Sequence, residues 1–414
     1  MTGQPTLVVT VHDGFYGSGT GAGYANRSFL QTLTGLLAPR VRLVLMPVYL
    51  ATDSPEYQAD WHQRSLDICR GAGVRVRPVD NGTDGQIRFG GLSAFEHLAG
   101  TTAVAVLEAM SRADPVAAIF FDVPFLGVPP LLPGWAVPSL AVIPRSTGLL
   151  HDPGNGARIQ FERSGLRYLA GNDGKIGAIS GYMRDHLVGD YHLPDTSLLD
   201  LPDGLTPQEW DIRPASTPFL PRRAEAGFLL ALGRAQPYKG WDDLLDALAL
   251  LRDRQVKLPH ALLAAVTDQP APTKYQQHLA DRIEDLGLDA TLLTRFDPAI
   301  RTLLAHPALR AAVIPSRTEP FGRVPLEAYV AGAAPVIATT AGGLAEQVID
   351  GKTGLTASPG DPASLAQAID RALGMTTSER DQMRKAGHRL ARTRFDHKQA
   401  IHHFLARFAP WSLP

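Results

Sequence analysis

Short apolar runs alternate with helix-like stretches along most of the chain, and this rhythm constrains the fold more than any other feature. The first series of predicted strands covers 7–11, 41–48, 74–79, 117–122, 140–145 and 176–180. A second series covers 227–232, 260–266, 291–296, 311–316 and 334–339. Strands that alternate with helices predict α/β domains with parallel sheets, which bind ligands at the carboxyl ends of their strands.

A proline-dense segment separates the two series of strands. It contains Pro202, Pro207, Pro214, Pro218 and Pro221. Such density prevents a helix and is typical of a semi-rigid linker. A chain of 414 residues is long enough for two domains. We therefore expect an N-terminal domain at 1–205, a linker at 206–226, a second domain at 227–394 and a final helical segment at 395–414.

Charge and cysteine content exclude several classes of partner and site. The formal net charge is −1 and the pI is about 6.9, so no general basic field exists to hold nucleic acid or an acidic membrane. Cys69 is the single cysteine, which excludes an internal disulfide and a cysteine metal cluster. The sequence shows no secretion signal and no apolar run of membrane-spanning length. We expect a soluble cytoplasmic protein, a monomer or a homodimer.

The stretch 316–328 carries the strongest chemical signal. A predicted buried strand precedes it, Phe321-Gly322 turns the chain, and a helix follows. Glu319 and Glu327 therefore face one crevice, with the backbone N–H groups of a helix N-terminus between them. Those groups attract anions, and the carboxylates accept hydrogen bonds from hydroxyls. A nucleotide sugar carries both kinds of group. As the alternative, the two carboxylates are only favourable partners of the helix dipole.

A glycine-rich loop, residues 12–23, lies between the first predicted strand and the first predicted helix, where a phosphate can bind. The dinucleotide fingerprint G-x-G-x-x-G fails from Gly17 and from Gly19, and no Walker lysine is present. A flexible, solvent-exposed loop is the alternative interpretation.

Arg234 and Lys239 straddle a predicted turn after the strand 227–232. Arginine offers a fixed fork and lysine a movable charge, so together they could neutralise a pyrophosphate. A salt-bridged surface loop is the alternative. No Asp-x-Asp motif occurs, and no histidine set has metal-ligand spacing with a third partner. We therefore expect no required metal and no cofactor besides a nucleotide-diphosphate sugar as donor substrate.

The order of these motifs resembles the retaining glycosyltransferases of family 4. The matching pieces are Gly233-Arg234…Lys239-Gly240, Pro315-Ser316…Glu319-Pro320-Phe321-Gly322…Glu327-Ala328, Gly332…Pro335-Val336, Gly342-Gly343…Glu346 and Gly351…Gly354. They cover most of the C-terminal half in register. The resemblance implies the GT-B fold, with two doubly wound Rossmann-like domains facing each other across a cleft and the segment 395–414 crossing back to the first domain. The implied activity is sugar transfer from a nucleotide-diphosphate sugar to a small polar acceptor.

The resemblance also implies a role for each matching residue. Glu327 would take the ribose hydroxyls and Glu319 the hydroxyls of the transferred sugar. Arg234 and Lys239 would stabilise the departing diphosphate. The family is thought to react on one face, with a donor phosphate oxygen helping to deprotonate the acceptor. The other implied donor contacts are Gly21, Gly23, Arg295, Phe296, Phe321, Gly322 and Arg323.

Arg145 departs from the family, most members of which have a histidine there that meets the donor sugar. An arginine stays charged and cannot serve as a base, but it could grip a phosphate or a carboxylate. Asp122 ends another predicted strand, and His151 follows six positions after Arg145, so both are candidate acceptor or sugar contacts. As the alternative, Arg145 pairs with a carboxylate such as Asp122 or Glu162 and supports the fold.

A narrower similarity concerns the acceptor. Ser146-Thr147-Gly148-Leu149…His151 resembles bacterial members that glycosylate aminocyclitols in antibiotic pathways. Because Arg145 alters this pattern, a thiol or a carboxylate-bearing molecule remains an alternative acceptor. The same residue leaves a second class of function open, a catalytically weakened GT-B protein that binds a nucleotide sugar as a sensor or partner subunit.

Overall fold

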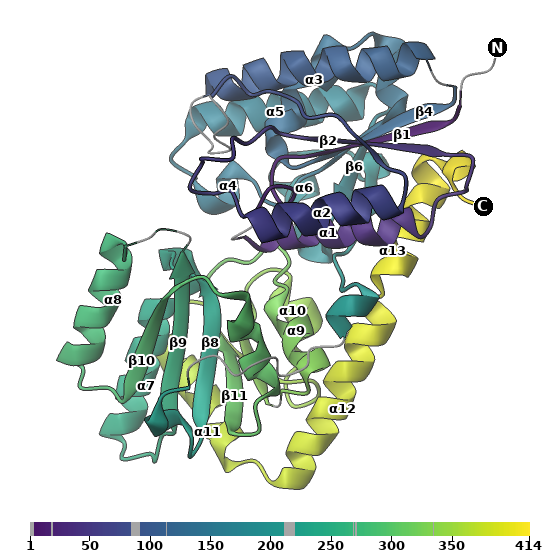
Figure 1. Cartoon of the computed structure of the whole chain (residues 1–414). Coiled ribbons are helices and arrows are strands. Elements are labelled where there is room, and N and C mark those ends of the chain that lie inside the picture. The colour runs from purple at the N-terminus through teal and green to yellow at the C-terminus, as the bar shows by residue number, and fades with distance from the viewer. Residues whose placement is uncertain are drawn as a thin grey trace. The chain divides into compact units, whose positions relative to one another are not determined.

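The computed structural model describes residues 4–17, 20–83, 92–112, 114–210, 220–267, 269, 271–333 and 335–414. The chain divides into two units, with crossings between Thr206 and Pro207 and between Asp396 and His397 (Figure 1). Residues 397–414 therefore belong to the N-terminal unit, although they follow the C-terminal unit in the sequence. The expected division after 205 lies one residue from the first crossing. The expected linker, 206–226, lies partly outside the described residues.

The N-terminal unit contains a parallel sheet. Its strands are β1 (Thr6–Val11), β2 (Arg42–Pro47), β3 (Arg75–Val76), β4 (Val116–Phe121), β5 (Leu140–Ile143), β6 (Lys175–Ala178) and β7 (Leu198–Asp200). The order is β3-β2-β1-β4-β5-β6-β7, so β1 pairs with both β2 and β4. The strands are apolar nearly throughout because helices cover both faces of such a sheet. The sequence prediction missed β7, which has three residues.

Helices cover this first sheet. They are α1 (Gly21–Thr34), α2 (Ala59–Gly71), α3 (Leu92–Arg112), α4 (Gly148–His151), α5 (Gly156–Gly171), α6 (Gly181–Gly189) and α13 (His397–Phe408). Figure 1 shows α3 and α5 on one face and α1 and α2 on the other. The Thr20 hydroxyl caps α1 by accepting from the Gly23 N–H at 3.0 Å. Among the helices that the structure describes, each is too short or too polar to span a bilayer.

The last helix, α13, belongs to the core of the N-terminal unit. It packs against α1 and β7, and Ile401, Phe404 and Leu405 are almost completely buried. The ring of His397 lies 6.3 Å from that of Phe29 on α1. Part of the buried face of α1 is therefore covered by a segment that follows the whole C-terminal unit in the sequence.

The C-terminal unit repeats the plan. Its strands are β8 (Phe228–Arg234), β9 (His260–Thr267), β10 (Ala290–Arg295), β11 (Leu309–Ile314), β12 (Val336–Thr339) and β13 (Leu355–Ala357). They are parallel in the order β10-β9-β8-β11-β12-β13. Its helices are α7 (Trp241–Asp253), α8 (Lys274–Asp285), α9 (Val324–Ala331), α10 (Leu344–Gln347), α11 (Pro362–Gly374) and α12 (Thr377–Arg394). The predicted start of α11 is confirmed, because Asp361 caps it and Pro362 is its first residue.

Each sheet reverses its strand order once. The reversal falls between β1 and β4 in the first sheet and between β8 and β11 in the second. Loops that leave neighbouring strands at such a point diverge and open a crevice at the carboxyl ends. The loops after β8 and β11 hold Lys239 and Glu319, and those after β1 and β4 hold the glycine-rich segment and Asp122.

We predict that Phe404→Ala destabilises the protein by about 3–5 kcal/mol, because it removes a fully buried ring between α13 and the rest of the N-terminal unit. Urea unfolding of the intact chain measures the loss. His403→Ala, an exposed neighbour on the same helix, is the control and should change stability by less than about 0.5 kcal/mol. Equal effects of the two substitutions would contradict the packing described for α13.

Candidate functional site

The loops that follow β8 and β11 touch each other through their backbones. Gly240 has a φ of +72°, and a Cβ there would lie 1.9 Å from the carbonyl oxygen of Pro315. Only glycine fits this left-handed, close-packed position. The Arg317 N–H donates to the carbonyl of Tyr238 at 2.8 Å. These backbone contacts hold the two loops together independently of their side chains.

Lys239 and Glu319 meet across this contact. The Lys239 ammonium donates to Oε2 of Glu319, and both side chains are about five-sixths buried, being 16% and 14% exposed. The Ser316 hydroxyl donates to the same oxygen at 3.3 Å. The structure thus brings together a cation and a carboxylate that lie 80 positions apart in the sequence.

The turn from Glu319 into α9 depends on Gly322. Its φ is +83°, and a Cβ there would lie 2.8 Å from Cγ of Glu319. The carbonyl of Glu319 accepts from the Gly343 N–H at 2.9 Å, and the amide of Gln347 donates to the carbonyl of Phe321 at 2.6 Å. The predicted donor contact Phe321 is itself buried, so its ring supports the turn.

Glu327 lies in the first turn of α9, as the sequence predicts, and is buried. The guanidinium of Arg301 contacts both carboxylate oxygens of Glu327: its Nε lies 3.1 Å from Oε2 and its Nη2 lies 3.0 Å from Oε1. Arg323, one turn earlier, has its Nε 3.6 Å from Oε1. The Nη2 of Arg323 instead donates to Glu209 at 2.5 Å. Arg301 and Glu209 were not identified from the sequence, which offers no spacing that links them to α9.

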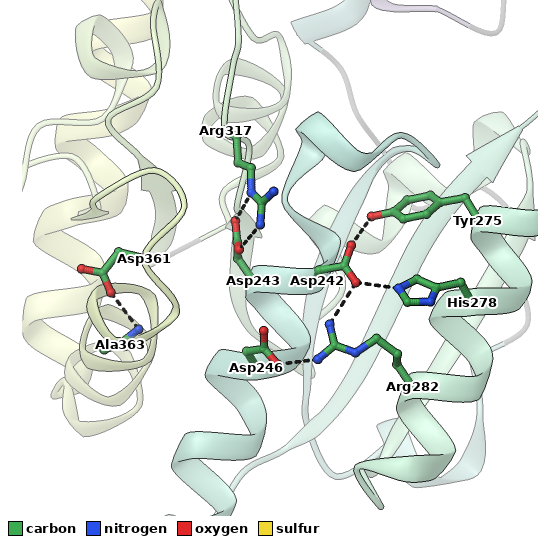
Figure 2. A network of polar contacts seen from close by, with 9 residues as sticks. All are labelled: Asp242, Asp243, Asp246, Tyr275, His278, Arg282, Arg317, Asp361 and Ala363. Atoms are coloured by element: carbon green, nitrogen blue, oxygen red, sulfur yellow. Dashed lines mark hydrogen bonds and ion pairs between the residues drawn. The ribbon is translucent and has the colours of Figure 1, made fainter.

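A second cluster of charges fastens the loop after β11 to α7 (Figure 2). Arg317 binds both carboxylate oxygens of Asp243, at 2.7 and 2.5 Å. The neighbouring Asp242 accepts from side chains of α8, namely Tyr275 at 2.7 Å, His278 at 3.0 Å and Arg282 at 2.9 Å. Burial by itself would raise the pKa of Asp242, but these hydrogen bonds outweigh it and lower the pKa. The acidic start of α7 thus has a structural role.

Three other predicted site residues, the catalytic candidate Arg234 and the donor contacts Arg295 and Phe296, lie at or just after the ends of strands. Arg234 is exposed at the end of β8, and its Nη2 donates to the Tyr238 hydroxyl at 2.5 Å. Arg295 is exposed at the end of β10. Phe296 follows it, and its N–H donates to the carbonyl of Thr267 at 3.0 Å. Arg234 and Arg295 therefore present positive charge to solvent at the carboxyl edge of the second sheet.

The glycine-rich segment of the N-terminal unit folds onto the start of α1. Gly21 begins this helix and Gly23 lies in its first turn. The Thr20 hydroxyl donates to the Asp13 carboxylate, and the Asn26 amide donates to the carbonyl of Asp13 at 3.1 Å. Ser18 and Gly19, in the middle of the predicted phosphate loop, lie outside the described residues.

Arg145 is buried inside the N-terminal unit, 6% exposed. Its Nε donates to the Asn26 amide oxygen at 2.7 Å, and its Nη1 pairs with the carboxylate of Asp203. Its guanidinium also lies 4.9 Å from the centre of the Phe121 ring. The sequence did not single out Asp203, because an acid in an irregular proline-rich segment carries no periodic signal.

The alternative that Arg145 pairs with a carboxylate is confirmed by Asp203, but the two carboxylates named as examples, Asp122 and Glu162, have other partners. Asp122 accepts from the backbone N–H of Val123 at 2.9 Å and from that of Arg145 at 3.4 Å. Glu162 accepts from the Gly148 N–H at 2.8 Å and from Arg158 at 2.9 Å. Nearby donors from the backbone and from Arg158 thus occupy these two carboxylates.

His151, the remaining predicted contact, ends the short helix α4 and is partly exposed. Its N–H donates to the carbonyl of Thr147 at 3.2 Å. The Thr147 hydroxyl in turn lies 2.8 Å from Nε2 of His186, whose Nδ1 lies 2.6 Å from Asp190. The loop between Arg145 and His151 is thus held by buried polar contacts.

Part of the chain is similar in sequence to known proteins. Residues 213–390 match the sequence model of the family described as glycosyl transferases group 1. D-inositol 3-phosphate glycosyltransferase of Frankia alni is 40% identical over 154 residues, which are 36% of this chain and 37% of that protein. Glycogen synthase of Mycobacterium tuberculosis is 35% identical over 184 residues, 42% of this chain and 41% of that protein. The chain thus aligns with about two fifths of the length of these relatives.

Solved structures resemble the whole chain. Sucrose-phosphate synthase of Thermosynechococcus elongatus superposes with a TM-score of 0.74 at 19% identity, covering 99% of this chain and 100% of that one. Anabaena Alr3699/HepE, crystallised with UDP and glucose, superposes with a TM-score of 0.66 at 18% identity, covering 97% and 100%. The chain therefore has the GT-B fold of two Rossmann-like α/β domains, and its residues 213–390 carry the sequence pattern of group 1 glycosyltransferases.

Proposed function

We propose that this protein is a retaining glycosyltransferase that moves a sugar from a nucleotide-diphosphate sugar to a small polar acceptor. The observation that carries the proposal is the meeting of Lys239 and Glu319 at the carboxyl ends of β8 and β11. It supplies a cation for a diphosphate and a carboxylate for sugar hydroxyls at the reversal point of one sheet, where α/β proteins bind ligands.

The C-terminal unit offers groups for each part of such a donor. Lys239 exchanges Glu319 for the diphosphate, which carries more negative charge, and Arg234 assists from the end of β8. Glu319 then accepts hydrogen bonds from hydroxyls of the transferred sugar. Glu327 takes the ribose hydroxyls, and the nucleobase lies near Phe296. The charge that develops on the leaving diphosphate is stabilised electrostatically, which is the main contribution expected here.

Retention fits a reaction on one face of the donor, in which a donor phosphate oxygen takes the acceptor proton. This route uses no protein base at the position of Arg145, which stays charged. The two cations near the diphosphate, Arg234 and Lys239, would do the work that a chelated metal does in other folds. Their presence also favours turnover over a purely binding role.

The acceptor would bind to the N-terminal unit, because the family match lies at residues 213–390 in the other unit. The name of the Frankia alni relative refers to D-inositol 3-phosphate, which is a polyol. The segment Ser146–His151 resembles members that glycosylate aminocyclitols, which are also polyols. We propose a small polyhydroxylated acceptor of this kind, in natural-product biosynthesis.

We predict that Lys239→Ala weakens the binding of a nucleoside diphosphate by about 1.5–3 kcal/mol, the scale of a hydrogen bond to a charged group. Arg234→Ala should weaken it less, because this side chain is exposed. Calorimetry with UDP, GDP and ADP measures both effects, and Lys257→Ala, an exposed lysine on another loop, is the control. Unchanged affinity in both test variants would rule out this diphosphate site.

We further predict turnover without a divalent metal, since the sequence has no Asp-x-Asp motif and two cations flank the expected diphosphate. Mass spectrometry of a screen of donors and acceptors would first identify a productive pair. Its rate should be unchanged by EDTA. A rate abolished by the chelator and restored by magnesium or manganese would contradict the prediction.

Arg145 has a test that separates support of the fold from contact with substrate. Arg145→Met leaves the buried Asp203 without its cation, so we expect a loss of about 3–5 kcal/mol in the free energy of unfolding. Arg145→Met combined with Asp203→Leu should recover much of that loss, and the exposed Arg167→Met should change little. A slower transfer rate with unchanged stability in Arg145→Met would instead show that this arginine contacts a substrate.

A further inference from the structure

We propose that Arg301 is a positioning residue that orients Glu327 to recognise the two adjacent hydroxyls of the donor's ribose; the proposal rests on the function proposed above. Nothing in the motif that contains Glu327 requires an arginine at position 301. The inference comes from the two-pronged contact in which each guanidinium nitrogen meets a different oxygen of the carboxylate, at 3.1 and 3.0 Å.

The segment that carries Arg301 is built to hold it in place. It is a 3₁₀ helix, η8 (Pro298–Ala305), which begins with the Asp297 carboxylate accepting from the Ala299 N–H at 2.8 Å. Ile300 and Leu303 anchor it to the core, and η8 packs against α9. The side chain of Arg301 is only 20% exposed. A partly buried guanidinium that contacts both oxygens of a carboxylate fixes the orientation of that carboxylate as well as its distance.

The contact leaves Glu327 able to bind a diol. A carboxylate has about four lone-pair sites, two on each oxygen. Arg301 occupies one site on Oε1 and one on Oε2. One site on each oxygen is therefore left by this fork, and two vicinal hydroxyls can donate to both oxygens together. A ribose has such a pair, whereas a 2′-deoxyribose or a 3′-deoxyribose has lost one member of it.

Arg323 cannot replace Arg301 in this task. Its Nη2 is held by Glu209 at 2.5 Å, and its Nε lies 3.6 Å from Oε1 of Glu327, beyond a good hydrogen bond. Without Arg301, Glu327 still has the Arg323 side chain one turn earlier, with Nε 3.6 Å from Oε1. The carboxylate would turn toward it and away from the orientation that the fork imposes.

The experiment compares affinities for matched nucleotides by calorimetry on the full chain. The tightest binder among UDP, GDP and ADP is selected, and its 2′-deoxy and 3′-deoxy forms are measured beside it. The unmodified protein should prefer the ribonucleotide by about tenfold or more, the scale of one lost hydrogen bond to a charged group. Arg301→Lys keeps the charge but loses the fork, and Arg301→Met loses both. Both variants should bind the ribonucleotide about tenfold more weakly and the deoxy forms almost unchanged.

Controls separate this role from simple support of the fold. Arg254→Met removes an exposed arginine after α7 and should keep the ribose preference, while Glu327→Gln should reduce it. If Arg301→Met does not fold, as judged by its melting temperature, Arg301→Lys carries the test. Equal weakening for ribose and deoxyribose forms would overturn the positioning role and leave the proposed function standing. Failure of the unmodified chain to bind any of the three nucleotides would overturn the proposed function, and this inference with it.

Discussion

The parallel pairing of β8 with β11 is the constraint on which the candidate site depends. These strands are neighbours in the sheet although β9 and β10 lie between them in the sequence. The loops that follow these strands leave from the same edge of the sheet. Their backbones touch at Gly240 and Pro315, so no side chain fits between the two loops at this point. Lys239 and Glu319 are consequently forced to meet. A buried pair of this kind is a weak source of stability, because both charges lose water. Its value is that each partner is already in place when a more strongly charged ligand competes for the lysine.

Most charged groups around this site are matched by fixed partners. Arg317 holds Asp243, Arg301 holds Glu327, and Arg323 holds Glu209. Such pairs fix the orientation of the side chains that take part in them, and the Arg301–Glu327 pair uses only one lone-pair site on each carboxylate oxygen. Arg234 and Arg295 lie exposed at the edge of the same sheet. Lys239, by contrast, must exchange its carboxylate partner Glu319 for an anion before it can bind one.

The sequence was sufficient for features that depend on local patterns. Apolar runs located the long strands, and Asp361-Pro362 located the start of α11. The spacing of Glu319 and Glu327 located the turn into α9, since both lie within one short stretch. It was insufficient where the partner comes from elsewhere in the fold. Arg145 has several carboxylates within reach in principle, and only the packed structure selects Asp203. The three-residue strands β7 and β13 were missed because pairing, rather than composition, creates them.

The position of α13 has a consequence for how the protein is made. The N-terminal unit is completed by residues 397–414, which are synthesised only after the whole of residues 207–396. Until then the face of α1 that carries Phe29 lacks the helix that covers it. The C-terminal unit has all of its residues earlier and can fold first, which reverses the usual order in which domains fold during synthesis. While residues 207–396 are being synthesised, the first unit therefore lacks the helix that packs against α1 in the folded protein.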